Sequence, residues 1–400
     1  MSGPLDGLKV VEVGVAMAGP YCSMILADYG AEVIKIERVG KGDDSRHWPP
    51  YFHGTMPYYF AAANRNKRSV ALDLKSPQGV AIAKRLMQEA DIVVENYRVG
   101  ALERAGLGYD ALASDNPRLI YCSISGFGRT GPRASDPAND IFMQAYSGGM
   151  SITGEADGGP VKMGLSAADL GAGMFAAIGI LMAVEQRHRT GRGQRVDTSL
   201  LQGQLAMLSY HLTYYFASGN VPQRRGASGQ VNVPYQAFRT ADDWIVIAAF
   251  TEDMWRGVCR ALERLEWSED PRFRSADQRI AHRDELIALL NERLLTQPAR
   301  HWIEKLRVHG VPCTPINRID QIVAEEQVRA GNMIAEIDVP QLGPIRMASP
   351  PIQLSASRAA ITRPPPRLGQ HSEEVLLQLG FSKIEIEQFG AQGAVGFDNT

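Results

Sequence analysis

The chain has 400 residues, of which 44% are hydrophobic, and its formal net charge at pH 7 is −2. This length predicts two domains or one large domain with an insertion, and the near-neutral charge argues against a nucleic-acid-binding protein. The four cysteines are scattered and the eight histidines form no HxH or HExxH pattern, so the sequence gives no support for a metal site.

The N-terminal residues, Met1 to Gly7, lack a basic region followed by an apolar core, so we expect no signal peptide. The longest apolar runs are interrupted short of the ~20 residues that span a bilayer, so we expect no membrane segment. Cysteines without a pattern are typical of free thiols in a reducing compartment. The sequence therefore predicts a cytoplasmic protein.

Strand and helix patterns alternate through the first 125 residues. Helices are predicted at 19–29 and from Ser76 onward. Short apolar or β-branched runs predict strands at 8–13, 32–37, 69–74, 91–95 and 118–123. This alternation is typical of an α/β fold with a parallel, doubly wound, Rossmann-like sheet, in which ligands bind at the carboxyl ends of the strands.

Glycine-rich loops follow these patterns at two places. The segment Gly14 to Gly19 after the first strand is not a GxGxxG motif, but a turn that leads into a helix offers backbone N–H groups to an anion. The segment from Pro132 to Gly164 is also rich in loops. Such loops occur beside ligands and in plain turns alike, so neither segment identifies a site alone.

Asp169 precedes a long apolar segment, Met174 to Val184, which reads as a buried helix ending in basic residues and Gly193. The helix dipole at this end favours an ionised carboxylate, and small neighbours (Ala167, Ala168, Gly171, Ala172, Gly173) leave room for a bulky group to approach it. An approachable, ionised carboxylate can act as a nucleophile. The alternative is an ordinary helix cap, for which Asp is a preferred residue.

The second half of the chain has a different character. A strand at 195–199 and a helix at 200–216 are followed by a polar, Gly- and Arg-rich segment, and a hairpin pattern begins near Tyr235. Helices are predicted at 252–264, 284–296, 299–308, 372–379 and 383–389, and an extended segment at 343–349. We therefore predict a large domain in residues 1–216, a linker in 217–231, a small α+β domain in 232–316, and a return linker with the last part of the large domain in 317–400.

A set of motifs, in order along nearly the whole chain, resembles the class III CoA-transferases, the formyl-CoA and carnitine CoA-transferase family. Each motif alone is weak, but nine in order are specific. They are Ala18 to Tyr21, Leu26 to Glu37, Gly42 to Arg46, Asn64 to Lys75, Val94 to Tyr97, Gly126 to Pro132, Asp169, Arg189 to Gly193 and Leu368 to His371.

This resemblance implies that Asp169 attacks the thioester of an acyl-CoA donor. A mixed anhydride and then an aspartyl-CoA thioester would carry CoA to an incoming carboxylic acid, and covalent catalysis would divide one difficult exchange into smaller steps. The partners implied are an acyl-CoA and a carboxylic acid, with a CoA thioester as substrate, no permanently bound cofactor and no metal. The resemblance also implies an interlocked homodimer.

The resemblance carries the CoA contacts onto positions that follow successive strand ends. Arg38 would meet the nucleotide phosphates, Arg104 would add charge, and Ala18 would approach the pantetheine end. The adenine and diphosphate site would be lined by Leu72, Asp73, Leu74 and Lys75 and by Asn96, Tyr97 and Arg98. Met17, Asn139 and Asp140 complete the expected contacts.

Two departures from formyl-CoA transferases bear on the substrate. Met17 stands where those enzymes have Gln, and Phe250-Thr-Glu-Asp253 lacks their run of glycines, which disfavours formyl-CoA and oxalate. The sequence as a whole is closer to those of the succinyl-CoA-dependent dicarboxylate transferases, so a C4–C6 dicarboxylate acceptor is expected. Its second carboxylate would need a cation, for which Arg46 and Arg225 are the candidates, with His47 as a further possibility.

Two alternatives remain open. An α-methylacyl-CoA racemase would share the fold, but its chemistry needs a His in the loop where this chain has Asn139, which cannot take a proton at neutral pH. A non-catalytic acyl-CoA-binding protein is the other alternative, and Asp169 in its small-residue setting argues against it. Trapping of an activated aspartyl group by hydroxylamine would distinguish a transferase from both.

Overall fold

The structure is a computed structural model that describes residues 3–229 and 232–398. It divides into two compact units. The first comprises the chain up to Gly149, Lys162–Asn220 and the residues from Arg329 on, and the second comprises Met150–Val161 and Val221–Val328. The predicted linker at 217–231 ends in two residues, 230 and 231, that lie outside the described residues.

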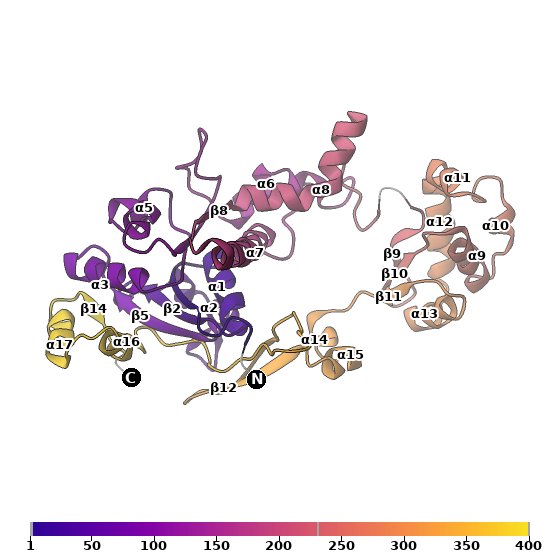
Figure 1. The fold of residues 1–400 in the computed structure, drawn as a ribbon. Helices are drawn as coiled ribbons and strands as arrows, with labels where there is room; N and C mark the ends of the chain where they lie inside the picture. Colours follow the sequence, from indigo (N-terminus) through magenta and orange to yellow (C-terminus); the bar gives the residue numbers. More distant parts are fainter. Residues whose placement is uncertain (1–2, 230–231, 399–400) are drawn as a thin grey trace. The chain divides into compact units, whose positions relative to one another are not determined.

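A mainly parallel sheet organises the first unit (Figure 1). Within the described residues it has seven strands in the order β14-β5-β2-β1-β6-β7-β8, and all neighbours are parallel except β14 and β5. The bounds are β1 Lys9–Val13, β2 Glu32–Glu37, β5 Lys67–Leu72, β6 Ile92–Glu95, β7 Ile120–Ser125, β8 Arg195–Ser199 and β14 Val395–Gly396. The order reverses between β1 and β6, which is where a doubly wound sheet binds its ligand.

Both faces of this sheet are buried. Val10 packs with α1, α7 and α8 on one face, and the next residue, Val11, packs with α3, α16 and α17 on the other, as expected for parallel strands covered by helices on both sides. The helices of this unit are α1 Ala18–Asp28, α2 Tyr58–Asn64, α3 Pro77–Gln88, α4 Ala101–Arg104, α5 Tyr109–Ala113, α6 Asp140–Tyr146, α7 Ala167–Thr190, α8 Leu200–Ser218, α16 Ser372–Gln378 and α17 Lys383–Ala391.

The C-terminal segment closes the open edge of β5. The Ser69 amide donates to His371 Nδ1 at 3.2 Å, and the Ala71 amide donates to Ser372 Oγ at 3.1 Å. Farther along the strand, Val395 of β14 pairs with Leu72. The backbone groups of an edge strand, which would otherwise be exposed, are thus occupied, and this explains the motif around His371.

The second unit has its own core around an antiparallel sheet with the strand order β11-β10-β9. Phe238, Trp255 and Trp302 are fully buried there. Its elements are β9 Tyr235–Arg239, β10 Trp244–Ala248, β11 Cys313–Pro315, α9 Glu252–Ala261, α10 Glu266–Glu269, α11 Ala276–Ala281, α12 Arg283–Leu294, α13 Ala299–Val308 and α14 Ile319–Ile322.

The remaining elements are short. The first unit contains two small antiparallel hairpins, β3 Tyr51–Phe52 with β4 Met56–Pro57 and β12 Ile334–Val339 with β13 Gly343–Ala348. The others are α15 Glu326–Ala330 and the 3-10 turns Asp44–His47 and Gly149–Ile152. The prediction of an α/β fold with a large, mainly parallel sheet is confirmed.

One sequence expectation needs correction. Among the described residues, α7 is long and apolar enough to cross a membrane by length and composition, although we had expected the apolar runs to be too short. The helix packs against α1, α8, β7 and β8, and its residues Ala168, Ala172 and Ala176 are fully buried in the core. On the face that carries these residues, the helix is apolar because it forms part of the core of the first unit.

Candidate active site

A cavity of about 180 Å³ lies at the carboxyl ends of three parallel strands, beside the point where the strand order reverses. The segments that follow β1, β6 and β7 line it, together with Leu200 after β8 and Asp169 from α7. All of these residues belong to the first unit. The fold therefore places Asp169 at the position where doubly wound sheets bind ligands.

Asp169 lies in the first turn of α7, whose N-cap residue, Ser166, makes no side-chain capping bond. The amide of Ala168 donates instead to Asp140 Oδ1 at 2.9 Å, so a carboxylate from α6 caps the helix. The second oxygen of Asp140 accepts a hydrogen bond from Gln144 at 2.7 Å. Asp169 is therefore not the cap of its own helix, and the alternative reading as an ordinary cap residue is wrong.

The electrostatic prediction for Asp169 is also wrong. Burial, followed by the nearby charge of Asp140, raises the pKa of Asp169 to about 7. The pKa rises because water is excluded from the carboxylate and a second anion lies close by. The carboxylate is consequently about half ionised near neutral pH, and its ionised form is more basic than that of an ordinary Asp.

The loop between β1 and α1 forms the wall of the cavity at residues 15–18. Ala16 has a φ of 61°, a left-handed conformation that is uncommon for a residue with a side chain. Its amide donates to Asp43 Oδ1 at 3.0 Å, and the side chain of Asn96 bonds both the amide and the carbonyl of Val15, at 2.9 and 3.0 Å. Side chains from neighbouring segments therefore hold this loop in a strained shape.

The small residues around Asp169 serve helix packing. A Cβ atom on Gly173 would lie 2.8 Å from the carbonyl oxygen of Ala18, so only glycine lets α1 approach α7 this closely. Gly203 of α8 lies similarly close to Ala172. The expectation that these residues leave room for a bulky group is corrected, because helices fill that space.

Tyr59 is a residue of this site that the sequence reasoning missed. Its hydroxyl hydrogen-bonds with Ser166, and burial, followed by the charges of Asp169 and Asp140, raises the pKa of the phenol. Trp48 packs edge-on against its ring, with ring centroids 4.9 Å apart. No motif signals this placement, because α2 lies about a hundred residues before α7 in the sequence.

The structure brings many of the predicted CoA contacts together. Those that line the cavity with Asp169 are Met17, Ala18, Asn96, Tyr97, Arg98 and Asn139. The Asn139 side chain accepts a hydrogen bond from the amide of Phe142 and so caps α6. Together with Asp169 these positions come from four separate segments, and the fold gathers them at the carboxyl ends of the strands.

Other predicted contacts lie outside the cavity. Arg38 pairs with Asp44 at 2.7 Å, although it is near enough to Tyr97 to affect the pKa of that phenol. The Leu72 side chain is fully buried in the core, so it can offer a ligand only its backbone. Asp140 is buried with both oxygens engaged. Asp73, which bonds the Lys75 amide, and Leu74, Lys75 and Arg104 do not line the cavity either.

The two candidate cations for the acceptor have different surroundings. The guanidinium of Arg46 makes two hydrogen bonds of 2.7 Å to Glu37, a third to the Pro366 carbonyl, and stacks over Phe60. These contacts give Arg46 a structural partner in Glu37, and its role toward an acceptor carboxylate stays a prediction. Arg225 belongs to the second unit, and its role stays a prediction.

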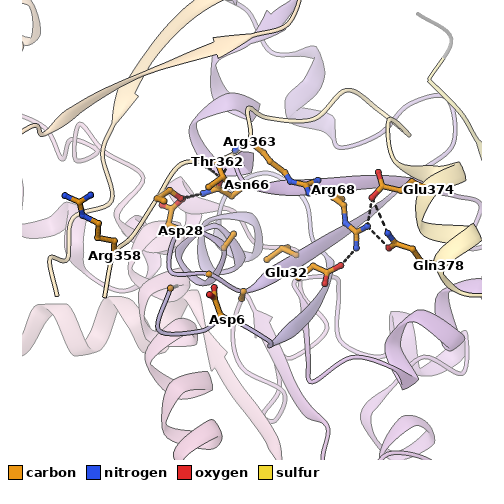
Figure 2. Close-up of a pocket in the computed structure, with 16 residues that line it drawn as sticks. Asp6, Asp28, Glu32, Asn66, Arg68, Arg358, Thr362, Arg363, Glu374 and Gln378 are labelled. Atoms are coloured by element: carbon orange, nitrogen blue, oxygen red, sulfur yellow. Dashed lines mark hydrogen bonds and ion pairs between the residues drawn. The ribbon is translucent and has the colours of Figure 1, made fainter. Parts of the chain in front are cut away.

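A larger cavity, of about 510 Å³, lies at the opposite ends of the strands, where β2 and β5 begin (Figure 2). Part of its polar lining is joined by ion pairs and hydrogen bonds. Arg68 bonds Glu32, Glu374 and Gln378, and Asn66 bonds Asp28. The cavity lies at the amino ends of the strands and contains no counterpart of Asp169. We therefore do not assign the active site there.

Within the described part of the chain, no group of three or more His, Cys, Asp or Glu residues could hold a metal ion. The chemistry that the described site offers is therefore that of a carboxylate with a raised pKa, facing a cavity walled by backbone and by a few polar side chains.

Comparisons with known proteins identify the family. The sequence model of CoA-transferase family III matches residues 5–372. The chain is 37% identical over 393 residues to a succinyl-CoA:glutarate CoA-transferase of Mus musculus, covering 98% of this chain and 90% of that one. It is also 37% identical over 382 residues to a succinate–glutarate CoA-transferase of Agrobacterium fabrum, covering 94% and 96%.

A solved structure is similar over almost the same range. The crystal structure of a CAIB/BAIF family protein from Brucella suis superposes with a TM-score of 0.86 at 36% identity, covering 95% of this chain and all of that one.

Proposed function

The chain belongs to CoA-transferase family III and is an enzyme of the CoA-transferase type, and from this premise we propose that it transfers CoA from succinyl-CoA to a C4–C6 dicarboxylate through covalent intermediates on Asp169. The observation that carries the proposal is the cavity at the strand ends, into which Asp169 brings a carboxylate with a pKa of about 7. A carboxylate of raised basicity that is still substantially ionised at neutral pH suits nucleophilic attack.

The proposed reaction conserves atoms and charge at each step. An oxygen of ionised Asp169 attacks the thioester carbonyl carbon, the C–S bond breaks, and CoA leaves as a thiolate with the electron pair. A mixed anhydride between Asp169 and the donor acyl group remains. The thiolate then attacks the aspartyl carbonyl carbon, and the donor acid leaves as its carboxylate.

The second half repeats these steps in reverse. The acceptor carboxylate attacks the aspartyl-CoA thioester and expels the thiolate, which attacks the acceptor carbonyl of the new anhydride and releases Asp169. No redox change occurs and no proton is gained or lost overall, so the steps need no permanently bound cofactor. Each carbonyl addition develops negative charge on oxygen, and the N-terminus of α1, which no side chain caps, borders the cavity as a source of N–H donors.

The choice of substrates rests on the relatives. Those named above are succinyl-CoA:glutarate and succinate–glutarate CoA-transferases. This chain aligns with each of them over at least nine-tenths of both chains. We therefore infer succinyl-CoA as donor and a dicarboxylate as acceptor. The residue that binds the distal carboxylate remains to be found, with Arg225 as our candidate.

A screen of acyl-CoA donors against carboxylic acids, with the thioester products identified by mass spectrometry, tests this function. We expect transfer from succinyl-CoA to glutarate, mesaconate or itaconate to exceed transfer to matched monocarboxylates and to oxalate. Asp169→Ala should abolish transfer and still fold. Residual transfer by that variant within tenfold of the wild type would exclude Asp169 as nucleophile, whereas better monocarboxylate acceptors would exclude only the dicarboxylate reading.

Hydroxylamine adds a direct test of the covalent step. It should modify Asp169 in the presence of succinyl-CoA and leave the protein intact in its absence. Solvent deuterium entering the α-carbon of an acyl-CoA without transfer would instead support the racemase alternative, which the capping role of Asn139 does not favour.

We also propose that the enzyme acts in the cytoplasm as an interlocked homodimer. The support for a dimer is an exposed apolar surface in the first unit. It comprises Met174, Phe175, Ile178, Leu181 and Met182 of α7 and Met207, Tyr210, Tyr214, Tyr215 and Phe216 of α8. Exposed apolar side chains in this number on two helices that pack together favour an interface, although the backbone of α8 is kinked at Ser209.

A further inference from the structure

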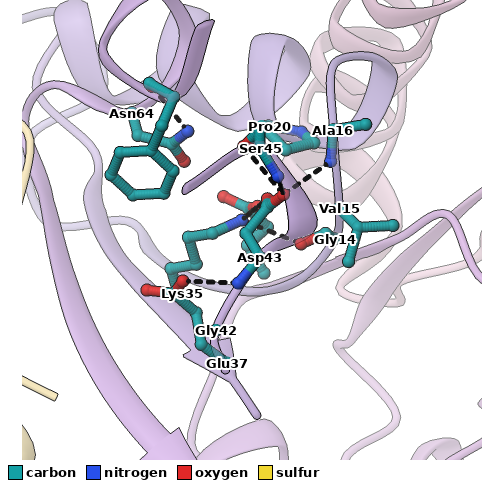
Figure 3. A network of polar contacts seen from close by, with 12 residues as sticks. Gly14, Val15, Ala16, Pro20, Lys35, Glu37, Gly42, Asp43, Ser45 and Asn64 are labelled. Carbon is teal, nitrogen blue, oxygen red and sulfur yellow. Dashed lines mark hydrogen bonds and ion pairs between the residues drawn. The ribbon is translucent and has the colours of Figure 1, made fainter. Parts of the chain in front are cut away.

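A buried network of charged side chains lies directly behind the loop that walls the cavity (Figure 3). Glu12 is at its centre, 2.6 Å from Lys35 Nζ and 2.7 Å from Lys67 Nζ. Lys35 also lies 3.1 Å from Asp43, and all four side chains are essentially inaccessible to water. Glu37 joins the network through the Asp43 amide, which donates to it at 3.1 Å.

The network is closely balanced in charge. Lys35, Lys67 and Arg46 face Glu12, Glu37 and Asp43. Burial alone would raise the pKa of Asp43, but Lys35 and the hydrogen bonds from Ser45 and Ala16 bring it down to about 2. Burial alone would likewise lower the pKa of Lys35, and Glu12 and Asp43 raise it above its ordinary value. Both groups are therefore charged across the physiological range of pH.

Stability alone does not explain such a network. Desolvation of buried ions offsets much of their attraction, and apolar side chains of similar volume often stabilise a core as well or better. What the ions contact is therefore more informative than their number. A chain that keeps six charged groups in its interior gains a defined geometry at the atoms to which they bond.

Those atoms are the backbone of the cavity wall. Lys35 Nζ donates to the Gly14 carbonyl at 2.8 Å, and Asp43 Oδ1 accepts from the Ala16 amide at 3.0 Å. Lys67 Nζ donates to the Pro20 carbonyl in α1 at 2.8 Å. The ions thus hold the loop at Gly14 and at the amide of its strained residue, Ala16, and hold the first turn of α1 that follows.

We propose that Asp43, oriented by Lys35 and Glu12, is a positioning residue for the transferase reaction: it fixes the left-handed turn at Ala16 and thereby sets the cavity wall that faces Asp169. The role rests on the proposed function of this site, although the conformation of the loop can be measured independently of it. Asp43 touches no reacting atom and acts through the backbone of residues 14–18.

The test compares two variants of Asp43 with a control elsewhere in the first unit. Asp43→Ala removes the acceptor of the Ala16 amide, and Asp43→Asn keeps an acceptor oxygen while losing the charge. The control is Asp28→Asn, which breaks another buried ion pair, with Arg65 at 2.7 Å, at the far end of α1. Asp28 does not line the cavity that contains Asp169, so this control reports the general cost of a broken buried pair.

We expect Asp43→Ala to lower kcat by ~10- to 100-fold with a smaller change in KM, the size of effect that a displacement of about 1 Å near reacting groups produces. Asp43→Asn should recover part of that loss. Asp28→Asn should melt at a lower temperature and keep the wild-type kcat. Equal kcat in Asp43→Ala and Asp28→Asn, compared at the same folded fraction, would overturn the proposal.

Amide hydrogen exchange supplies a readout that needs neither transfer activity nor the alanine variant. In Asp43→Asn the amides of residues 14–18 should exchange faster, while those of β1 and β6 keep their protection. Unchanged exchange in the loop would overturn the positioning role. A wild type without transferase activity would refute the proposed function but leave this measurement valid.

Discussion

At the scale of single residues, the carboxylate of Asp140 has both a structural and an electrostatic role. It caps α7 through the Ala168 amide, and its charge adds to burial in raising the pKa of Asp169 to about 7. The first turn of α7 would otherwise favour an ionised carboxylate. The carboxyl group of Asp169 in this turn is nevertheless only about half ionised at neutral pH.

The pH dependence of turnover follows from that pKa. Only ionised Asp169 can attack, so kcat/KM should fall about tenfold per pH unit below about 7 and level off above it. Asp140→Asn removes the neighbouring charge and should shift this transition to lower pH. The measurement is kcat/KM for succinyl-CoA between pH 5 and 9, and a profile that stays flat down to pH 5 would contradict the assignment.

Stability should change in the opposite direction to activity when Asp169 is replaced. The folded state raises this pKa, so Asp169 costs no stability below its ordinary pKa of 3.8, a growing amount as the pH rises from there to about 7, and a constant amount above about 7. Asp169→Asn removes that cost. At pH 8 it should be inactive and more stable than the wild type, by up to roughly 4 kcal/mol at one pKa unit per ~1.4 kcal/mol.

Urea unfolding at pH 8 and at pH 4.5 measures this difference. The stabilisation should be much smaller at the lower pH, where wild-type Asp169 is mostly protonated. Equal stabilisation at both values would mean that the ionised form of Asp169 is not penalised by folding.

Arg46 and Arg225 can be separated by their effects on acceptors. Arg46→Ala would leave the buried Glu37 without its partner and should cost about 3–5 kcal/mol of stability, with monocarboxylate and dicarboxylate acceptors affected alike. If Arg225 binds the distal carboxylate, Arg225→Ala should lower kcat/KM selectively for dicarboxylates. Comparing glutarate with butyrate in both variants tests this, and a selective loss in Arg46→Ala would restore that residue as the acceptor site.

At the scale of elements, the approach of α1 to α7 sets the distance between the cavity wall and Asp169. Gly173→Ala would place a Cβ 2.8 Å from the Ala18 carbonyl and push these helices apart, whereas at Gly171 the new Cβ would meet the flexible sulfur of Met207 at 2.7 Å. Both changes gain roughly 1 kcal/mol in helix propensity. We expect Gly173→Ala to lose stability and kcat and Gly171→Ala to keep both nearly unchanged.

Kinetics and thermal unfolding of this pair make the comparison. Similar behaviour in the two variants would show that α1 and α7 can shift without consequence for the site.

The sequence predicted elements well where local pattern and packing agree. The strands β2 and β8 match the predicted residues throughout, because each run is bounded by turn residues and has no competing helical period. The strand β14 and the helix α6 were missed. The first has only two residues and is defined by its partner β5, and the second is a single short helix in a segment rich in loops.

The site was less predictable than the elements. Asp169 stood out because its neighbours and a family resemblance marked it. Its pKa could not be read from the sequence, because the upward shift comes first from burial and then from the charge of Asp140, which lies 29 positions earlier and is folded against the same turn. Tyr59 carried no signal, and Asp43 stood within a motif of the family resemblance that gave no hint of its contact with Ala16, since both roles arise from contacts with distant segments.

At the scale of the whole molecule, the exposed apolar surface of α7 and α8 should be an interface between two copies. Met182 and Phe216 are 67% and 77% exposed, and placing a charge on either would oppose burial against a second chain. Met182→Glu and Phe216→Glu should weaken dimerisation, measured by sedimentation velocity. The matched control is Ile384→Glu on α17, which is 68% exposed and outside that surface.

A wild type that sediments as a monomer would refute the dimer. A control variant that dissociates as readily as the other two would instead move the interface away from α7 and α8.

The closing of the β5 edge by residues 369–396 affects the order in which the nascent chain can complete its fold. Six strands of the sheet are translated before Val221–Val328, the larger part of the second unit. Until the C-terminal segment follows, β5 keeps an open edge and one face of the sheet lacks α16 and α17. Such an edge pairs readily with other chains, so we expect chains that end within the second unit to aggregate or to be degraded, and only a completely synthesised chain to reach a protected sheet.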